Sequence, residues 1–272
     1  MRIPFQRPVS PHVILSILLF SFAFLTLQGC AITADEELPE DMTVADIYQA
    51  AKEQLNDGNY AEAVILYEKL EARFPYGKYA QRAQLEIAFA YYKDNEPETA
   101  ILAAERFIKL HPNHPNVDYA YYLRGLASFD AGNSFFEKLF NQEASERDPK
   151  AARRAFQYFA DMVKRFPKSR YTPDAIKRMK TLRENLAKYE IHVAGYYMRR
   201  KAYLAAANRA KYVIENYSRT KAVPDALAMM VSAYRKLDLN DLADDALRVL
   251  KLNHPGHAAT LESSQIKGQT AQ

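Results

Sequence analysis

The sequence is poor in the residues that mark several common protein classes. Among 272 residues there are no tryptophans, eight glycines and one cysteine, Cys30. A single cysteine excludes an intramolecular disulfide and a cysteine-rich zinc site. So few glycines argue against an all-β fold with many tight turns. No glycine-rich phosphate loop, HExxH motif or Ser/His/Asp signature is present, so no catalytic residue, cofactor or metal is predicted.

An excess of positive charge is also lacking once the N-terminus is set aside. The formal net charge is +4, and the first 29 residues contribute Arg2 and Arg7 but no acid. Without them the chain carries about +2, far from the concentrated Lys and Arg of a nucleic-acid-binding surface. The sequence predicts no nucleic-acid partner.

The N-terminus has the pattern of a secretory signal. After Arg2 and Arg7, an apolar run of 15 residues spans 13–27, short of the roughly 20 residues that cross a membrane. It ends in Leu27-Gln28-Gly29-Cys30, which resembles the bacterial lipobox although Gln28 departs from the usual small or aliphatic residue. We therefore predict a lipoprotein signal peptide over 1–29 and lipidation of Cys30. The alternative is an ordinary signal peptide, or an anchor helix, with an incidental cysteine.

The residues after Cys30 indicate where such a lipoprotein would reside. Ala31 follows the cysteine, and by analogy with proteobacterial sorting the absence of Asp there predicts the outer membrane. Two or more acyl chains anchor a protein stably where one does not. Residues 30–42 are acidic without periodicity and predict a flexible tether.

A helix–turn–helix unit then recurs along the chain. In its first copy, Gly58 can adopt the positive φ of a helix end, and Pro75 cannot continue a helix. Between them Tyr60, Ala63, Tyr67 and Leu70 fall on one helical face. Small residues, a turn and a terminal proline at these spacings are typical of tetratricopeptide repeats.

Five copies are predicted, with end markers at positions 75, 112, 167, 218 and 255. The spacings of 37, 55, 51 and 37 residues indicate a 37-residue unit with two expansions. One expansion is residues 133–150, and the other makes one overlong helix from Thr172 to Arg200. We predict an all-α tetratricopeptide-repeat superhelical solenoid. Its parts are repeats 1–3 over 43–170, repeats 4–5 over 171–258 joined by the long helix, and a disordered tail over 259–272.

Several polar and aromatic residues allow two interpretations. In the pairs Tyr91-Tyr92, Tyr121-Tyr122 and Tyr196-Tyr197, one ring can pack while the next points about 100° away. The second ring lines a groove, or both rings are packed. His111 and His114 could suit a metal, but the prolines around them favour an inter-repeat turn. For Glu143 and Glu146, a solvated loop is favoured over acid–base chemistry.

Specific strings resemble the BamD family, outer-membrane lipoproteins of the β-barrel assembly machinery. The resemblance covers about 43–254 and includes DGNYAEA, RFPYGKYAQRAQLEIAFAYYK, HPNHPNVDYAYYLRGL, RDPKAARRAFQYFADMVKRFP and the long run that begins at DAIKRMK. It implies a periplasmic scaffold that binds the POTRA domains of BamA, accessory lipoproteins (BamC, BamE) and unfolded outer-membrane proteins. The family also carries a loop at 133–150, but the first half of this one is less similar.

The resemblance further implies two sites. By motif, Phe74 and Tyr76 are predicted to line a substrate-peptide pocket that receives a C-terminal β-signal. Tyr92, the second ring of its tyrosine pair, is predicted to join them. Asn208 and Arg209 are predicted to contact BamA, where an arginine can pair with a carboxylate.

These observations favour one function over two others. The leading hypothesis is a non-enzymatic scaffold, lipid-anchored in the outer membrane and facing the periplasm. The alternative is another periplasmic repeat adaptor serving cell-wall or envelope coordination. An enzyme on an α-solenoid, such as a peptidoglycan lyase, would need a catalytic lobe for which the repeats leave no room.

Overall fold

A computed structural model describes residues 38–130 and 149–270, and the side chains of these up to residue 263. Cys30 with the predicted signal peptide, Glu143 with Glu146, and nearly all of the predicted 133–150 expansion lie outside the described residues. The chain divides into two units, 1–42 and 43–272. The described part of the first is a short turn in which Met42 N donates to Pro39 O at 3.2 Å.

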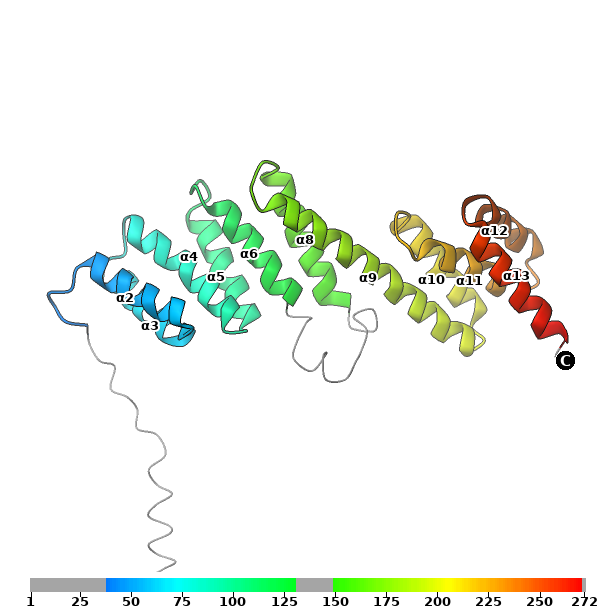
Figure 1. Cartoon of the computed structure of the whole chain (residues 1–272), viewed down its shortest axis with the longest axis horizontal. Coiled ribbons are helices and arrows are strands. Elements are labelled where there is room, and N and C mark those ends of the chain that lie inside the picture. The colour runs from blue at the N-terminus through cyan, green and yellow to red at the C-terminus, as the bar shows by residue number, and fades with distance from the viewer. Residues whose placement is uncertain (1–37, 131–148, 271–272) are drawn as a thin grey trace, which may run out of the picture. The chain divides into compact units, whose positions relative to one another are not determined.

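Within its described residues the second unit is built from α-helices alone (Figure 1). The first five are α2 (Val44–Asp57), α3 (Tyr60–Arg73), α4 (Lys78–Lys93), α5 (Pro97–Leu110) and α6 (Val117–Asp130). Then follow α8 (Pro149–Arg165), α9 (Thr172–Arg199), α10 (Tyr203–Asn216), α11 (Val223–Lys236), α12 (Asn240–Asn253) and α13 (Pro255–Thr270). None of these helices combines the length and apolarity needed to cross a membrane.

The helices stack in chain order. Each packs against the next from α2 to α13, and the first helices of successive repeats also touch, as in α2 with α4 and α4 with α6. This arrangement confirms the predicted tetratricopeptide-repeat solenoid.

The 37-residue unit is visible in the helix boundaries and turns. Helix α3 begins at Tyr60 and α5 begins 37 residues later, at Pro97. Helix α12 likewise begins 37 residues after α10. Each of the four helix turns concerned contains one residue in the left-handed region. These residues are Gly58 (φ 84°), Asn95 (φ 62°), Lys201 (φ 60°) and Asp238 (φ 58°). The turn therefore has one backbone geometry whichever residue occupies it.

Small buried residues let the paired helices approach closely, as predicted. Ala51, Ala63, Ala88 and Ala206 are fully buried. In the third repeat, a Cβ on Gly125 of α6 would lie 2.5 Å from a ring carbon of Phe159 on α8. Helix α8 is thus the second helix of repeat 3, displaced along the sequence as predicted.

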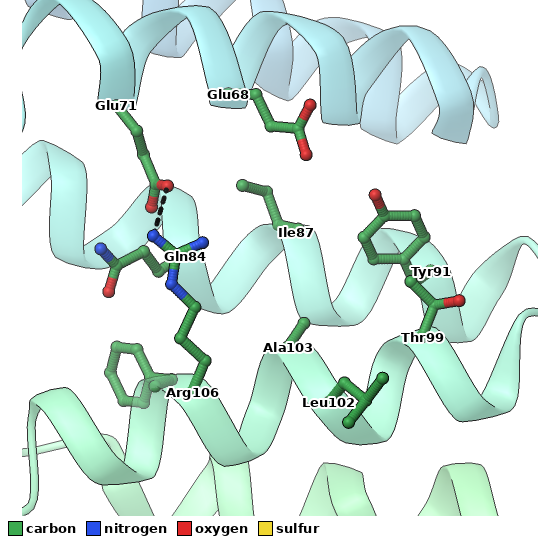
Figure 2. A pocket seen from close by; sticks show the side chains of 10 residues that line it. Glu68, Glu71, Gln84, Ile87, Tyr91, Thr99, Leu102, Ala103 and Arg106 are labelled. Atoms are coloured by element: carbon green, nitrogen blue, oxygen red, sulfur yellow. Dashed lines mark ion pairs between the residues drawn. The ribbon is translucent and has the colours of Figure 1, made fainter.

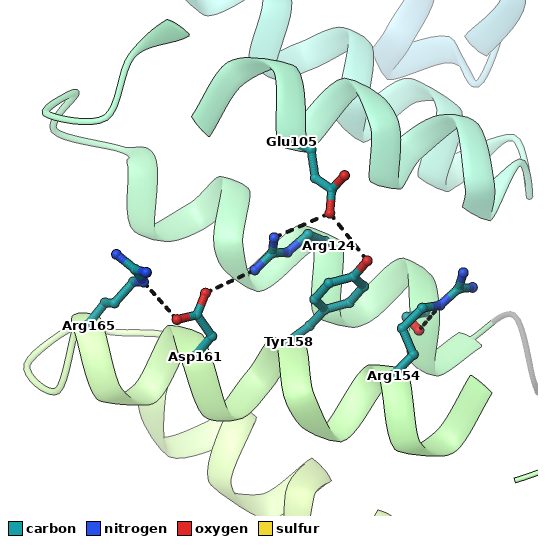
Figure 3. A network of polar contacts seen from close by, with 7 residues as sticks. Glu105, Arg124, Arg154, Tyr158, Asp161 and Arg165 are labelled. Atoms are coloured by element: carbon teal, nitrogen blue, oxygen red, sulfur yellow. Dashed lines mark hydrogen bonds and ion pairs between the residues drawn. The ribbon is translucent and has the colours of Figure 1, made fainter. Parts of the chain in front are cut away.

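A polar network also joins repeats 2 and 3 (Figure 3). The Arg124 side chain on α6 is 13% exposed, and it contacts Glu105 of α5 at 3.3 Å and Asp161 of α8 at 3.2 Å. Its guanidinium lies 4.2 Å from the ring centroid of Tyr158, whose hydroxyl donates to Glu105 at 3.3 Å. Three helices thus share one charge cluster, despite the insertion between α6 and α8.

Helix α9 is the predicted long helix, with 28 residues from Thr172 to Arg199. Leu182 packs in the core with Phe159 of repeat 3, whereas Ala187 packs with Val213 of repeat 4. One continuous helix therefore belongs to both cores.

The C-terminal tail corrects a prediction. The sequence suggests disorder over 259–272, but α13 extends through Thr270. Leu261 packs against Leu227 and Leu250, and Lys251 Nζ lies 2.7 Å from Glu262 Oε1. The segment is helical because it covers the apolar end of the last repeat.

Candidate functional site

The three predicted pocket residues do not lie together. Phe74 and Tyr76 occupy the connection between α3 and α4, where Tyr76 is 90% exposed. Tyr92 lies in the last turn of α4, about 21 Å from the start of this helix at Lys78 at a rise of 1.5 Å per residue, and Tyr76 precedes that start. The Tyr92 hydroxyl donates to Asp130 Oδ2 at 2.6 Å. The three side chains therefore do not form the single pocket that was predicted, because the length of α4 separates them.

The tyrosine pairs divide between the two interpretations. Tyr121 and Tyr122 are both 9% exposed, and Tyr122 stacks on Tyr171 with centroids 4.8 Å apart. In the third pair, Tyr196 is 48% exposed while Tyr197 packs against the core of repeats 4 and 5. Packing accounts for both rings of the second pair and for one ring of the third.

The two histidines lie in the turn between α5 and α6. The His111 and His114 rings each lie 5.2 Å from the ring centroid of Phe107, and His111 Nε2 is 2.8 Å from Gln84 Oε1. Across the residues described, no cluster of His, Cys, Asp and Glu is suited to a metal ion. Burial, followed by the charges of His111 and Arg82, lowers the pKa of His114. These side chains pack the turn.

A cavity of about 410 Å³ is formed by the first helices of repeats 1–3 and the segment before α9. We call it the cationic–aromatic pocket. Its charged lining residues are Lys52, Arg82, Arg170 and Glu86, and its aromatic ones include Tyr48, Phe89, Tyr119 and Tyr171. Lys52 Nζ pairs with Glu86 Oε1 at 2.7 Å, and the Arg170 guanidinium lies 4.7 Å from the Tyr171 ring centroid. Burial raises the pKa of Tyr119, so its hydroxyl stays neutral.

This composition suits an anionic group next to an aromatic side chain. Three cations face one carboxylate, and the tyrosine rings supply large apolar surfaces with polar tips. Sequence reasoning missed the pocket. The available signal was Tyr48 with Lys52, and Arg82 with Glu86, each four residues apart on one helical face. Only the stacking of α2, α4 and α6 shows that these faces meet.

Asn208 and Arg209 lie together on the exposed side of α10. Arg209 Nη1 donates to Glu190 Oε2 at 2.9 Å, and Arg153 Nη2 of α8 donates to Glu190 Oε1 at 3.3 Å. The Glu190 side chain is 1% exposed, whereas that of Arg209 is 44% exposed. We call Glu190, Arg153 and Arg209 the Glu190 triad. The hydrogen bond to Glu190 raises the pKa of Arg209.

The triad fixes one edge of the Arg209 guanidinium and leaves part of it accessible. A guanidinium has five N–H donors in a rigid fork, so an acidic group outside the protein can still pair with it. The sequence signal for Glu190 was a charged residue on the buried face of α9, three residues after Ala187 and four before Ala194.

Comparisons with known proteins match most of the chain. Residues 40–250 match a family model, YfiO, described as an outer membrane lipoprotein. Three curated relatives are each named outer membrane protein assembly factor BamD. The relative from Neisseria gonorrhoeae is 50% identical, covering 85% of this chain and 88% of the relative. The relative from Xylella fastidiosa (strain 9a5c) is 38% identical, covering 93% of this chain and 86% of the relative. The relative from Vibrio cholerae is 33% identical, covering 85% of this chain and 95% of the relative.

Solved structures with some likeness include crystal structures of MamA and of a kinesin light chain with TPR-like repeats. The MamA structure is 14% identical with a TM-score of 0.35, covering 83% of this chain and 98% of that one. The kinesin light chain structure is 15% identical with a TM-score of 0.34, covering 77% of this chain and 93% of that one.

Proposed function

The chain belongs to the YfiO family of outer membrane lipoproteins, which includes the assembly factors named BamD, and on this premise we propose that it is a non-enzymatic scaffold of the β-barrel assembly machinery. It binds the POTRA domains of BamA, the lipoproteins BamC and BamE, and unfolded outer-membrane proteins, and so promotes their insertion into the membrane. The family match over 40–250 carries this proposal, because it takes in every repeat rather than one.

We place the scaffold at the periplasmic face of the outer membrane, held there by lipid on Cys30. The lipobox resemblance and the family description support this location. The mass of the mature N-terminal peptide tests it: we expect an N-terminal Cys30 with acyl chains, and an unmodified or uncleaved N-terminus would contradict the anchor.

The contact with BamA is proposed at Asn208 and Arg209. Arg209 is held by a buried carboxylate from one side and is 44% exposed, so little side-chain entropy is lost when a partner carboxylate binds it. The complementary surface on the POTRA domains is therefore acidic.

Charge reversal at Arg209 tests this contact. We expect Arg209→Glu to weaken binding to isolated POTRA domains by at least about tenfold, because a favourable charge-assisted hydrogen bond becomes a repulsion. Lys211→Glu is the matched control, since Lys211 lies on the same helix and points about 200° away. Glu190→Gln should give a smaller loss, as Arg209 would be less well oriented. Unchanged binding by Arg209→Glu would refute the contact, whereas equal losses for Arg209→Glu and Lys211→Glu would indicate a general charge effect.

Segments of unfolded outer-membrane proteins are proposed to bind the cationic–aromatic pocket. The pocket lies in the N-terminal repeats, and its three cations and aromatic rings match a C-terminal carboxylate next to an aromatic residue. This pocket takes the role predicted for Phe74, Tyr76 and Tyr92, which the length of α4 separates.

A further inference from the structure

A second cavity, of about 250 Å³, lies between α3 and α5 over the surface of α4 (Figure 2). We call it the Glu71 groove. Figure 2 shows Glu71 and Arg106 near one end, Tyr91 near the other, and Ile87 between them. Leu102 of α5 adds a lining side chain that is 66% exposed. The groove therefore combines an apolar middle with a carboxylate at one end.

The carboxylate of Glu71 is incompletely satisfied. Its side chain is 14% exposed, and its Oε1 atom is buried without a hydrogen bond. Oε2 lies 3.8 Å from Arg106 Nη2, which is beyond hydrogen-bonding distance. Burial raises the pKa of Glu71 despite the opposing charge of Arg106 and a hydrogen bond from the Gln84 side chain. Buried acceptors without donors are uncommon and costly, so Glu71 keeps one carboxylate oxygen, Oε1, for which a ligand can supply a donor.

Arg106 is the cation that now lies beside the Glu71 carboxylate, and it binds this carboxylate weakly. Its side chain is 66% exposed, and a long, exposed ion pair contributes little. An incoming cation with better geometry can displace it. Glu68 also lines the groove, so the lining holds two carboxylates and one arginine.

We propose that the Glu71 groove is a docking site for a lysine side chain from a partner polypeptide. The aliphatic stem of a lysine would lie over Ile87, Ala103 and Leu102, and its ammonium would donate to Glu71. An ammonium has three rotatable donors on a flexible stem, so it can reach a carboxylate at the end of a narrow groove. Charge complementarity with Glu71 and Glu68, together with the apolar lining, selects this occupant. The site does not depend on the proposed function, because it shares no residue with the cationic–aromatic pocket or the Glu190 triad.

The proposal is tested with the full chain purified in detergent and two blocked peptides that carry a neutral fluorophore. One peptide is Gly-Ala-Lys-Ala-Gly and the other has norleucine in place of the lysine. Fluorescence anisotropy should show at least about tenfold tighter binding of the lysine peptide, since a charge-assisted pair is lost in the analogue. Equal binding of the two peptides, or no binding of either, would overturn the proposal.

Variants locate the binding at Glu71. Glu71→Gln should remove most of the preference for lysine. Glu62→Gln makes the same change at an exposed position of α3 that does not line the groove, and should leave the preference intact. Arg106→Gln should strengthen binding of the lysine peptide about threefold, because the competing cation is removed.

The Arg106→Gln variant keeps the test decisive if Glu71→Gln folds poorly, since Arg106 is largely exposed. A preference for lysine that survives Glu71→Gln, or weaker binding of the lysine peptide by Arg106→Gln, would contradict the groove as the site.

Discussion

At the scale of single residues, charged side chains are more deeply packed than their positions in the sequence suggest. Glu190 is 1% exposed, with an arginine on each side, and Arg124 is 13% exposed between two carboxylates. Buried charges persist when they are paired. A partner can bind the charged side chains that keep accessible donors, such as Arg209.

Arg82 provides a residue-scale prediction for the cationic–aromatic pocket. Arg82→Glu changes the charged lining from three cations and one carboxylate to two of each. We expect binding of a decapeptide with a C-terminal phenylalanine and a free carboxylate to weaken at least about tenfold, because the attraction for the carboxylate is lost. Peptide titration by calorimetry measures the effect.

Two controls accompany this measurement. Lys93→Glu makes the same charge change at the opposite end of α4, outside the pocket, and should have little effect. An amidated peptide should bind native protein weakly, and equal binding of amidated and free peptides would exclude carboxylate recognition.

At the scale of elements, the turn between the paired helices is the repeated feature. Four such turns have one residue at positive φ, but only the first of these is a glycine, Gly58. A non-glycine residue in the left-handed region costs about 1–2 kcal/mol. The later repeats therefore retain the turn geometry at a cost, which indicates that helix packing imposes it.

Lys201→Gly should stabilise the protein. Relief of the left-handed strain at Lys201 (φ 60°) exceeds the added unfolded-state entropy of glycine, for a net gain of about 0.5–1 kcal/mol. Urea denaturation followed by circular dichroism measures it. Lys211→Gly, in the interior of α10, is the control and should lower the free energy of unfolding by about 1 kcal/mol. A loss at both positions would show that Lys201 makes contacts that outweigh its strain.

At the scale of the whole repeat array, α9 connects two hydrophobic cores. Leu182 belongs to the core of the earlier repeats and Ala187 to that of the later ones, so the junction is about one helical turn long. Repeat proteins are stabilised by neighbour contacts, so we expect the shared helix to make the two cores unfold together.

Asn185→Pro should uncouple the two cores. Proline at this point in α9 removes a backbone hydrogen bond and clashes with the preceding turn, at a cost of about 3 kcal/mol or more. Calorimetry should show two unfolding transitions for this variant, and one for the native chain and for the Asn185→Ala control. A single transition in the proline variant would mean that contacts outside α9 couple the cores.

The sequence alone determined the repeat architecture. The 37-residue spacing, the turn at Gly58, the displaced second helix of repeat 3 and the long helix α9 were all predicted. These features depend on local chemistry: a glycine that accepts positive φ, prolines that end helices, and small residues at fixed helical spacing. Such signals act within one or two helices, so they can be read without knowing how the helices stack.

Tertiary structure decided which side chains meet. Glu190 pairs with Arg153 and Arg209, which lie 37 and 19 residues away in the sequence, and the length of α4 separates Tyr76 from Tyr92. The 259–270 segment is helical, and its Leu261 packs against the apolar end of the last repeat. A polar or apolar side chain acquires its partners only when neighbouring repeats stack, because stacking selects which faces of separate helices are brought together.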